Sequence, residues 1–139
     1  MKIMLCYDDS DEVKQCVLEA RKRAFAFKGE ILVVASHVSD DQHYPKRIEP
    51  VELGLKKIQA IFDDSGIPCE TLIAWRGFDD AAGEHLLVVA EQNKVDEIIV
   101  GIKDRSKLGK FLLGSVAQTL LLRAECPVLG VRQNLKGYR

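Results

Sequence analysis

Residues 100–118 read VGIKDRSKLGKFLLGSVAQ, and their pattern determines how the rest of the chain is interpreted. The stretch leaves an apolar run, crosses a basic loop that contains glycines, and enters a segment with helical spacing. A helix N-terminus presents free backbone N–H groups and the positive end of the helix dipole, and nearby lysines or arginines strengthen its attraction for anions. The stretch therefore predicts a strand, a phosphate-binding loop and a helix.

The same alternation of strand and helix continues on both sides of this stretch. Short continuous apolar runs predict strands buried on both faces, and they fall at residues 3–7, 31–36, 69–75, 98–100 and 128–131. Apolar residues at helical spacing predict helices between them, beginning at residues 9–10, near 50, at 79–80 and at 115. Phe27 is expected on the buried stripe of the first helix, and Gly29 is expected to end that helix.

Five strands that alternate with helices predict an α/β domain with an open, doubly wound parallel sheet and helices on both faces. If the first strand is central, the strand order is 3-2-1-4-5, and the order reverses between the first and fourth strands. Ligands bind beyond the carboxyl ends of the strands at such a reversal. Asp8 and Gly101 would then face the same crevice.

The length, net charge and composition of the sequence restrict the class of protein. A chain of 139 residues is one domain, with a polar tail at residues 133–139, and a net charge of −1 gives no general attraction to nucleic acid or membrane. No apolar run is long enough to cross a bilayer. The four cysteines form no CxxC pair, which favours buried thiols in a reducing compartment and predicts a cytoplasmic location.

Charge distinguishes the four predicted helix N-termini. The first three carry aspartates or glutamates, which satisfy the helix dipole and would repel phosphate. The fourth has no acid in its first turn, and it follows a loop with four cations, Lys103, Arg105, Lys107 and Lys110. In the alternative interpretation, Ser115 and Gln118 form a capping box and the lysines only keep a loop soluble. The two interpretations can coexist.

Other candidate chemistry is sparse. No cysteine or carboxylate stands at metal-ligand spacing from His37 or His43, so no metal site is predicted. Cys6 lies in an apolar strand, which makes it a poor nucleophile. No general base can be identified, so no catalytic residue is predicted.

Several motifs resemble the universal stress protein family over nearly the whole chain. Its signature, G-x2-G-x9-G-[ST], is matched by Gly101 and by Gly114 with Ser115. Residues 126–128, Cys-Pro-Val, match the family's step into its last strand, and residues 5–13, LCYDDSDEV, resemble its V-D-x-S opening and place Asp8 on the family's aspartate. The resemblance implies a Rossmann-like fold of the adenine nucleotide alpha hydrolase type.

The resemblance also implies a binding site for ATP or AMP, with Mg²⁺ only alongside the nucleotide. Asp8 and Ser36 would contact adenine or ribose. Gly101, Gly114, Ser115 and Val116 would line the phosphates, and Lys103 and Arg105 would add positive charge. The expected function is an adenine-nucleotide-binding regulatory protein of a stress response, with at most slow ATP hydrolysis. The family's last strand often pairs across a two-fold axis, which implies a homodimer through the strand between Val128 and Val131.

One residue departs from the signature. Asp104 replaces its second glycine, and family members that lack the full signature often do not bind ATP. The carboxylate would face polyphosphate unless it turned away, paired with Lys103 or Arg105, or shared a divalent cation. The alternative function is therefore a nucleotide-independent dimeric interaction module. A hydrolase or nucleotidyl transferase is a third possibility.

Overall fold

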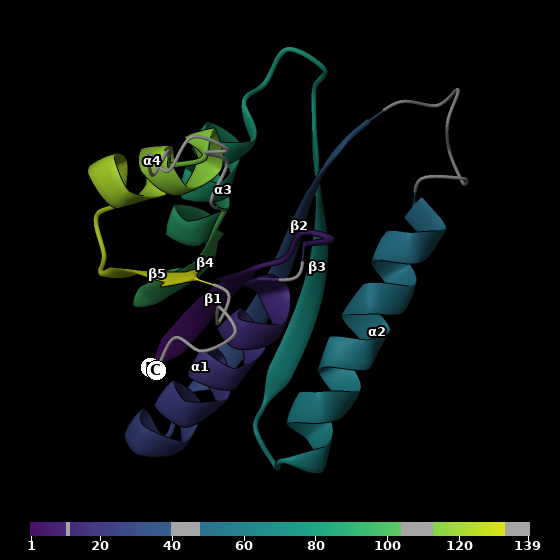
Figure 1. Ribbon diagram of the computed structural model, residues 1–139, viewed down its shortest axis with the longest axis vertical. Coiled ribbons are helices and arrows are strands. Elements are labelled where there is room, and N and C mark those ends of the chain that lie inside the picture. The colour runs from purple at the N-terminus through teal and green to yellow at the C-terminus, as the bar shows by residue number, and fades with distance from the viewer. Residues whose placement is uncertain (11, 40–47, 104–112, 133–139) are drawn as a thin grey trace, which may run out of the picture.

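Strands and helices alternate along the whole of the computed structural model, which describes residues 1–10, 12–39, 48–103 and 113–132 (Figure 1). In chain order, the elements are β1 (Lys2–Cys6), α1 (Glu12–Phe27), β2 (Glu30–Val38), α2 (Ile48–Asp64), β3 (Cys69–Arg76), α3 (Ala82–Gln92), β4 (Glu97–Ile102), α4 (Ser115–Arg123) and β5 (Val128–Arg132). All nine expected elements are present, with ends shifted by a few residues.

The sheet has the predicted order, β3-β2-β1-β4-β5, and every neighbouring pair is parallel. In the central strand, Leu5 lies between Val33 of β2 and Ile99 of β4. The order reverses between β1 and β4, which confirms the doubly wound architecture. β3 and β5 are the two edge strands.

Alternate residues of the central strand serve two separate cores. Ile3 and Leu5 pack with α1 and α2, whereas Met4 and Cys6 pack with the α3 and α4 side. Because both faces of the strands are covered, they are continuously apolar rather than alternating. Figure 1 shows the helices in these two pairs, on opposite sides of the sheet.

Two expectations for α1 are wrong. Phe27 is 53 % exposed, and Cys16, which is fully buried, lies on the inward stripe instead. The left-handed residue that ends the helix is Lys28, with a φ of 51°, and not Gly29. Gly29 is needed for another reason, because a Cβ there would lie 3.1 Å from the carbonyl oxygen of Met1.

The start of α3 also differs from expectation. Its N-cap is Ala81, with no side-chain capping bond, because Asp80 turns back and accepts the backbone N–H of Gly77 at 3.0 Å. Gly83 lies at the contact with α4, where a Cβ would come within 2.8 Å of the Thr119 side chain. The glycine that weakens this helix locally therefore lets α3 and α4 pack closely.

One charged side chain lies in the core of the described residues. Glu97, at the start of β4, is only 4 % exposed. Its carboxylate accepts two hydrogen bonds from Arg23 of α1, one from Nε and one from Nη2, the second at 2.8 Å. The pair joins the first helix to the fourth strand, 74 residues away in sequence.

Candidate functional site

The predicted site residues meet at the carboxyl ends of the strands. A pocket of about 260 Å³ opens beside the ends of β1 and β4, between α4 and the end of β3. Seven of the eight predicted residues line it, namely Asp8, Ser36, Gly101, Lys103, Gly114, Ser115 and Val116. The eighth, Arg105, lies outside the described residues, as do Asp104, Lys107 and Lys110.

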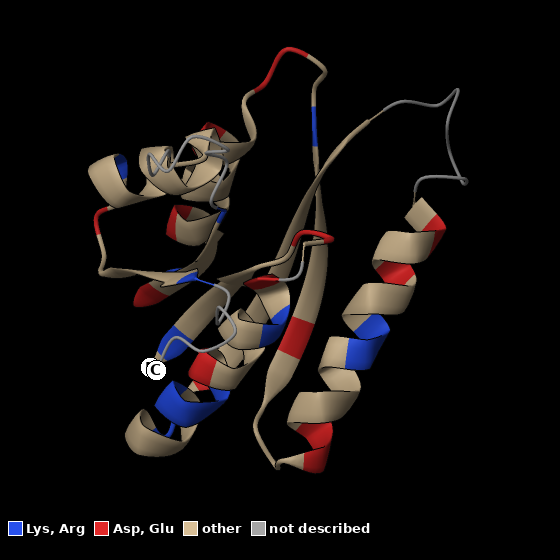
Figure 2. Cartoon of the chain, viewed as in Figure 1, with Lys and Arg blue, Asp and Glu red and all other residues tan. Residues whose placement is uncertain are grey.

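The N-terminus of α4 opens into this pocket without a cap. Its N-cap is Gly114, which has no side chain to bond the first-turn N–H groups, so the capping box between Ser115 and Gln118 is wrong. α4 has no acid in its first turn, whereas α1, α2 and α3 each have one. Figure 2 shows acidic residues at the start of α2 and in the loop before α3. Of the four described helix starts, that of α4 best suits an anion.

The two glycines of the pocket, Gly101 and Gly114, have different structural roles. Gly114 has a φ of −64°, which any residue adopts, and a Cβ there would meet nothing within 4 Å among the described residues. At Gly101 a Cβ would lie 3.0 Å from Cβ of Glu12 and 3.6 Å from Sγ of Cys16. Close packing of β4 on α1 explains Gly101, while Gly114 leaves open space where a ligand could approach the backbone.

An ion pair joins two residues that line the pocket. Nζ of Lys103, just after β4, lies 3.1 Å from Oδ2 of Asp8, just after β1. The other oxygen of Asp8 accepts the backbone N–H of Ser10 at 3.0 Å and also the Ser10 hydroxyl. Asp8 therefore orders the turn before α1 and holds Lys103 at the point where the strand order reverses.

A hydrogen-bonded chain on the other wall was not predicted from the sequence. Nε of Arg76, the last residue of β3, donates to Oγ of Ser36 at 3.0 Å. The same hydroxyl lies 3.0 Å from Nδ1 of His85 on α3. Both Ser36 and Arg76 line the pocket. Because the carboxyl ends of parallel strands meet at one edge, the position of Arg76 at the end of the third strand was the available signal.

The two cysteines near the pocket, Cys6 and Cys16, are unreactive at neutral pH. Burial raises the pKa of the Cys6 thiol far above its ordinary value, and the nearby Cys16 and Asp8 raise it further. Burial, with Asp8 and the glutamates of α1, raises the pKa of Cys16 to about 12. Neither thiol forms the nucleophilic thiolate at neutral pH.

We expect these two thiols to make the fold less stable in alkali. In the unfolded chain they ionise near the ordinary cysteine pKa of 9.0, whereas in the fold they stay protonated to much higher pH. Their stabilisation is therefore complete below pH 9 and is lost as the pH rises through the folded pKa. Between pH 9 and 10, each should lower the free energy of unfolding by up to about 1.4 kcal/mol per pH unit.

Urea denaturation at pH 8, 9 and 10 in the presence of reductant measures this effect. The Cys16→Ala variant is the control, because it removes one of four thiols whose pKa burial raises. It should therefore reduce the slope against pH by about a quarter. A free energy of unfolding that is constant from pH 8 to 10 would contradict the assignment.

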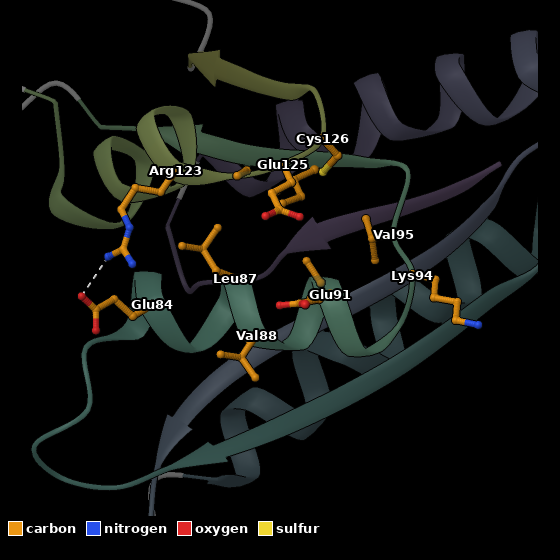
Figure 3. Close-up of a pocket in the computed structure, with 12 residues that line it drawn as sticks. Glu84, Leu87, Val88, Glu91, Lys94, Val95, Arg123, Glu125 and Cys126 are labelled. Atoms are coloured by element: carbon orange, nitrogen blue, oxygen red, sulfur yellow. Dashed lines mark hydrogen bonds and ion pairs between the residues drawn. The ribbon is translucent and has the colours of Figure 1, made fainter.

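A larger groove lies away from the predicted residues. It has a volume of about 570 Å³ and lies between α3 and the segment that joins α4 to β5 (Figure 3). Arg123 and Glu84 pair across one end at 3.0 Å, and Leu87, Val95 and Glu125 line the middle. None of the predicted site residues lies in it, so the smaller pocket is the better candidate despite its size.

The described residues form neither a metal-binding cluster nor a membrane span. No group of three or more histidines, cysteines, aspartates or glutamates is placed to hold a metal ion in the described part of the chain. Among the same residues, no helix is long and apolar enough to span a membrane.

Similarity to known proteins agrees with this geometry. The universal stress protein family matches residues 1–132. A universal stress protein of Thermus aquaticus, named for the 3′ region of the QAH/OAS sulfhydrylase gene, is 30% identical over 136 residues, covering 94% of this chain and 97% of that protein. The solved universal stress protein of Archaeoglobus fulgidus has a TM-score of 0.83 at 25% identity, covering 94% of this chain and 98% of that one. The structure of the universal stress protein from the same organism in complex with dAMP has a TM-score of 0.78 at 22% identity, covering 94% and 97%. The chain belongs to the universal stress protein family.

Proposed function

We propose that this protein binds an adenine nucleotide, ATP or AMP, in the pocket at the ends of β1 and β4, and acts as a regulatory protein of a stress response. The observation that carries the proposal is the α4 N-terminus, which has neither a cap nor an acid and opens into the pocket that Asp8 and Ser36 also line. The adenine preference is supported by family membership and by the dAMP complex of a related fold.

The residues present fit a nucleotide in two further respects. Among the described residues, Gly114 leaves open space beside the first backbone N–H groups of α4, where a larger side chain would reduce access to the backbone. Lys103 provides a cation beside the same crevice. Asp8 is the carboxylate among the described lining residues, and one carboxylate suits a Mg²⁺ ion that arrives with nucleotide phosphates better than a resident ion.

The alternative function is a nucleotide-independent interaction module. Asp104 favours it, because a carboxylate stands where the family's nucleotide-binding signature has glycine. Under the first function, we propose slow ATP hydrolysis at most, since the described pocket residues include no evident general base.

Calorimetry with ATP and AMP, each with and without Mg²⁺, tests the proposed function. Saturable binding by the wild-type chain is the expected result. The Asp104→Gly variant should bind ATP more tightly, because it removes a negative charge from the loop. No binding at millimolar nucleotide by the wild type, with binding created by Asp104→Gly, would establish the alternative function and rule out the first.

We also propose that the protein is a homodimer through β5 and that residues 1–139 form one domain. Among the described strands, β5 lies at one edge of the sheet, where a strand of a second chain could pair with it. Gly130 allows the side chain of Ile102 on β4 to pack directly over it. Light scattering that detects only the mass of a single chain would contradict the dimer.

The free thiols support a cytoplasmic location. Cys6, Cys16, Cys69 and Cys126 are all unpaired in the structure, as expected for a chain that folds in a reducing compartment.

A further inference from the structure

The pocket contains a cation whose charge has no carboxylate partner among the described residues. Arg76 is partly buried at the end of β3, and its Nε donates to the hydroxyl of Ser36. None of the carboxylates in the described part of the chain lies within ion-pair distance of it. A guanidinium has five N–H donors, and Ser36 uses one of them, so the described residues leave four for a ligand.

The guanidinium is held in place by the hydrogen bonds behind it. Ser36 Oγ accepts from Arg76 Nε and lies 3.0 Å from His85 Nδ1, so the serine hydroxyl is free to donate to the imidazole. This chain ties the end of β3 through β2 to α3. The four outer donors of Arg76 are therefore held in a fixed orientation, and little side-chain entropy remains to be lost when they bind an anion.

The two described cations of the pocket differ in availability. Lys103 is already paired with Asp8, whereas the Arg76 guanidinium donates to a neutral hydroxyl and pairs with no carboxylate of the described residues. Arg76 reaches Ser36 at the end of β2, on the opposite side of β1 from β4 and the N-terminus of α4. The pocket thus has two positions that favour an anion, one beside the end of β2 and one at the N-terminus of α4.

A nucleotide that carries phosphates only on its 5′ position, bound at the α4 N-terminus, would leave the position at Arg76 empty. We propose that Arg76 is a second anion subsite, and that the preferred ligand is an adenine nucleotide with an additional phosphate on its ribose. This inference rests on the proposed function, since it assumes that the 5′-phosphate lies at α4 and the nucleoside near Ser36.

Calorimetry with AMP, ADP, adenosine 3′,5′-bisphosphate and adenosine 2′,5′-bisphosphate tests the proposal. ADP and the two bisphosphates carry the same number of phosphates, and they differ in where the second one is attached. At least one bisphosphate should bind about tenfold more tightly than ADP, as expected for a charge-assisted hydrogen-bonded pair. Comparison of the 3′ and 2′ isomers identifies which hydroxyl carries the phosphate.

The Arg76→Met variant keeps most of the side-chain stem and removes the charge, so the affinity ratio of the preferred bisphosphate to ADP should fall to about one. Arg76→Lys should keep part of the ratio. Arg21→Met is the matched control, because it removes an arginine from the exposed side of α1 and should leave the ratio unchanged.

The outcomes separate this inference from the proposed function. If AMP and ADP bind but neither bisphosphate is preferred, the subsite is wrong and the function stands. If Arg76→Met weakens ADP as much as the bisphosphate, Arg76 serves the 5′-phosphates and the proposal is overturned. If no adenine nucleotide binds, both fail.

Discussion

Ser115→Glu is expected to weaken adenine-nucleotide binding by roughly thirtyfold or more and, at the same time, to stabilise the fold slightly. Ser115 is the exposed first residue of α4, and a glutamate there would place a negative charge where the phosphates are proposed to bind. Opposed like charges at an interface cost several kcal/mol. The same carboxylate would interact favourably with the helix dipole, by about 0.3–1 kcal/mol.

Calorimetry and thermal unfolding of the same preparation measure the two opposite effects. Because the variant is expected to be no less stable than the wild type, weaker binding could not be attributed to misfolding. Ala60→Glu is the matched control, since it adds the same charge at an exposed position of α2, away from the pocket. Undiminished nucleotide affinity in Ser115→Glu would show that the phosphates do not bind at α4.

Arg23→Met is expected to lower the free energy of unfolding by about 3 kcal/mol. The substitution would leave the Glu97 carboxylate, which is 4 % exposed, without its partner in the core. Removing one member of a buried ion pair costs about 3–5 kcal/mol, and the partial exposure of Arg23 places this case at the lower end. Arg23 also lies over the ring of Phe27, with Cζ 5.7 Å from the ring centroid, so a small further loss is expected.

Urea denaturation at pH 7 checks this effect. The double variant Arg23→Met and Glu97→Leu should recover most of the loss, because both charged groups are replaced by apolar ones. Glu19 and Lys22, an exposed pair on the same helix, provide the comparison, and Lys22→Met should change the stability by less than about 1 kcal/mol. Equal losses from Arg23→Met and Lys22→Met would mean that burial of Glu97 does not matter.

Much of the fold could be predicted from the sequence because its signals are local. The apolar runs of β1 and β2 have the length and continuity of buried parallel strands, and the chain between them has helical spacing. Right-handed crossovers then leave few topologies, and the order 3-2-1-4-5 is one of them. The acid-free start of α4 was equally local, because it depends on residues within one turn.

The errors arose where contacts between residues distant in sequence determine the local structure. Phe27 has the right spacing for the core, but α1 extends past the edge of the buried surface, so the ring remains exposed. A helix was expected to begin at residues 79–80, but Asp80 bonds Gly77 instead, and α3 begins at Ala82. The Arg76–Ser36–His85 chain joins residues 40 and 49 positions apart, and no spacing within one element could predict it. The side chains of the proposed second anion subsite are therefore the least predictable.

The division of the interior into two cores has a thermodynamic consequence. Substitutions that act in different cores share few contacts, so their effects on stability should be nearly additive. Leu86 and Ala117 line the ligand pocket and belong to the core of α3 and α4, whereas Val17, Ile58 and Phe62 belong to the other. Substitutions in the core of α1 and α2 can thus raise the stability of the fold without altering the pocket. Substitutions of the pocket residues in the other core should leave that gain in stability unchanged.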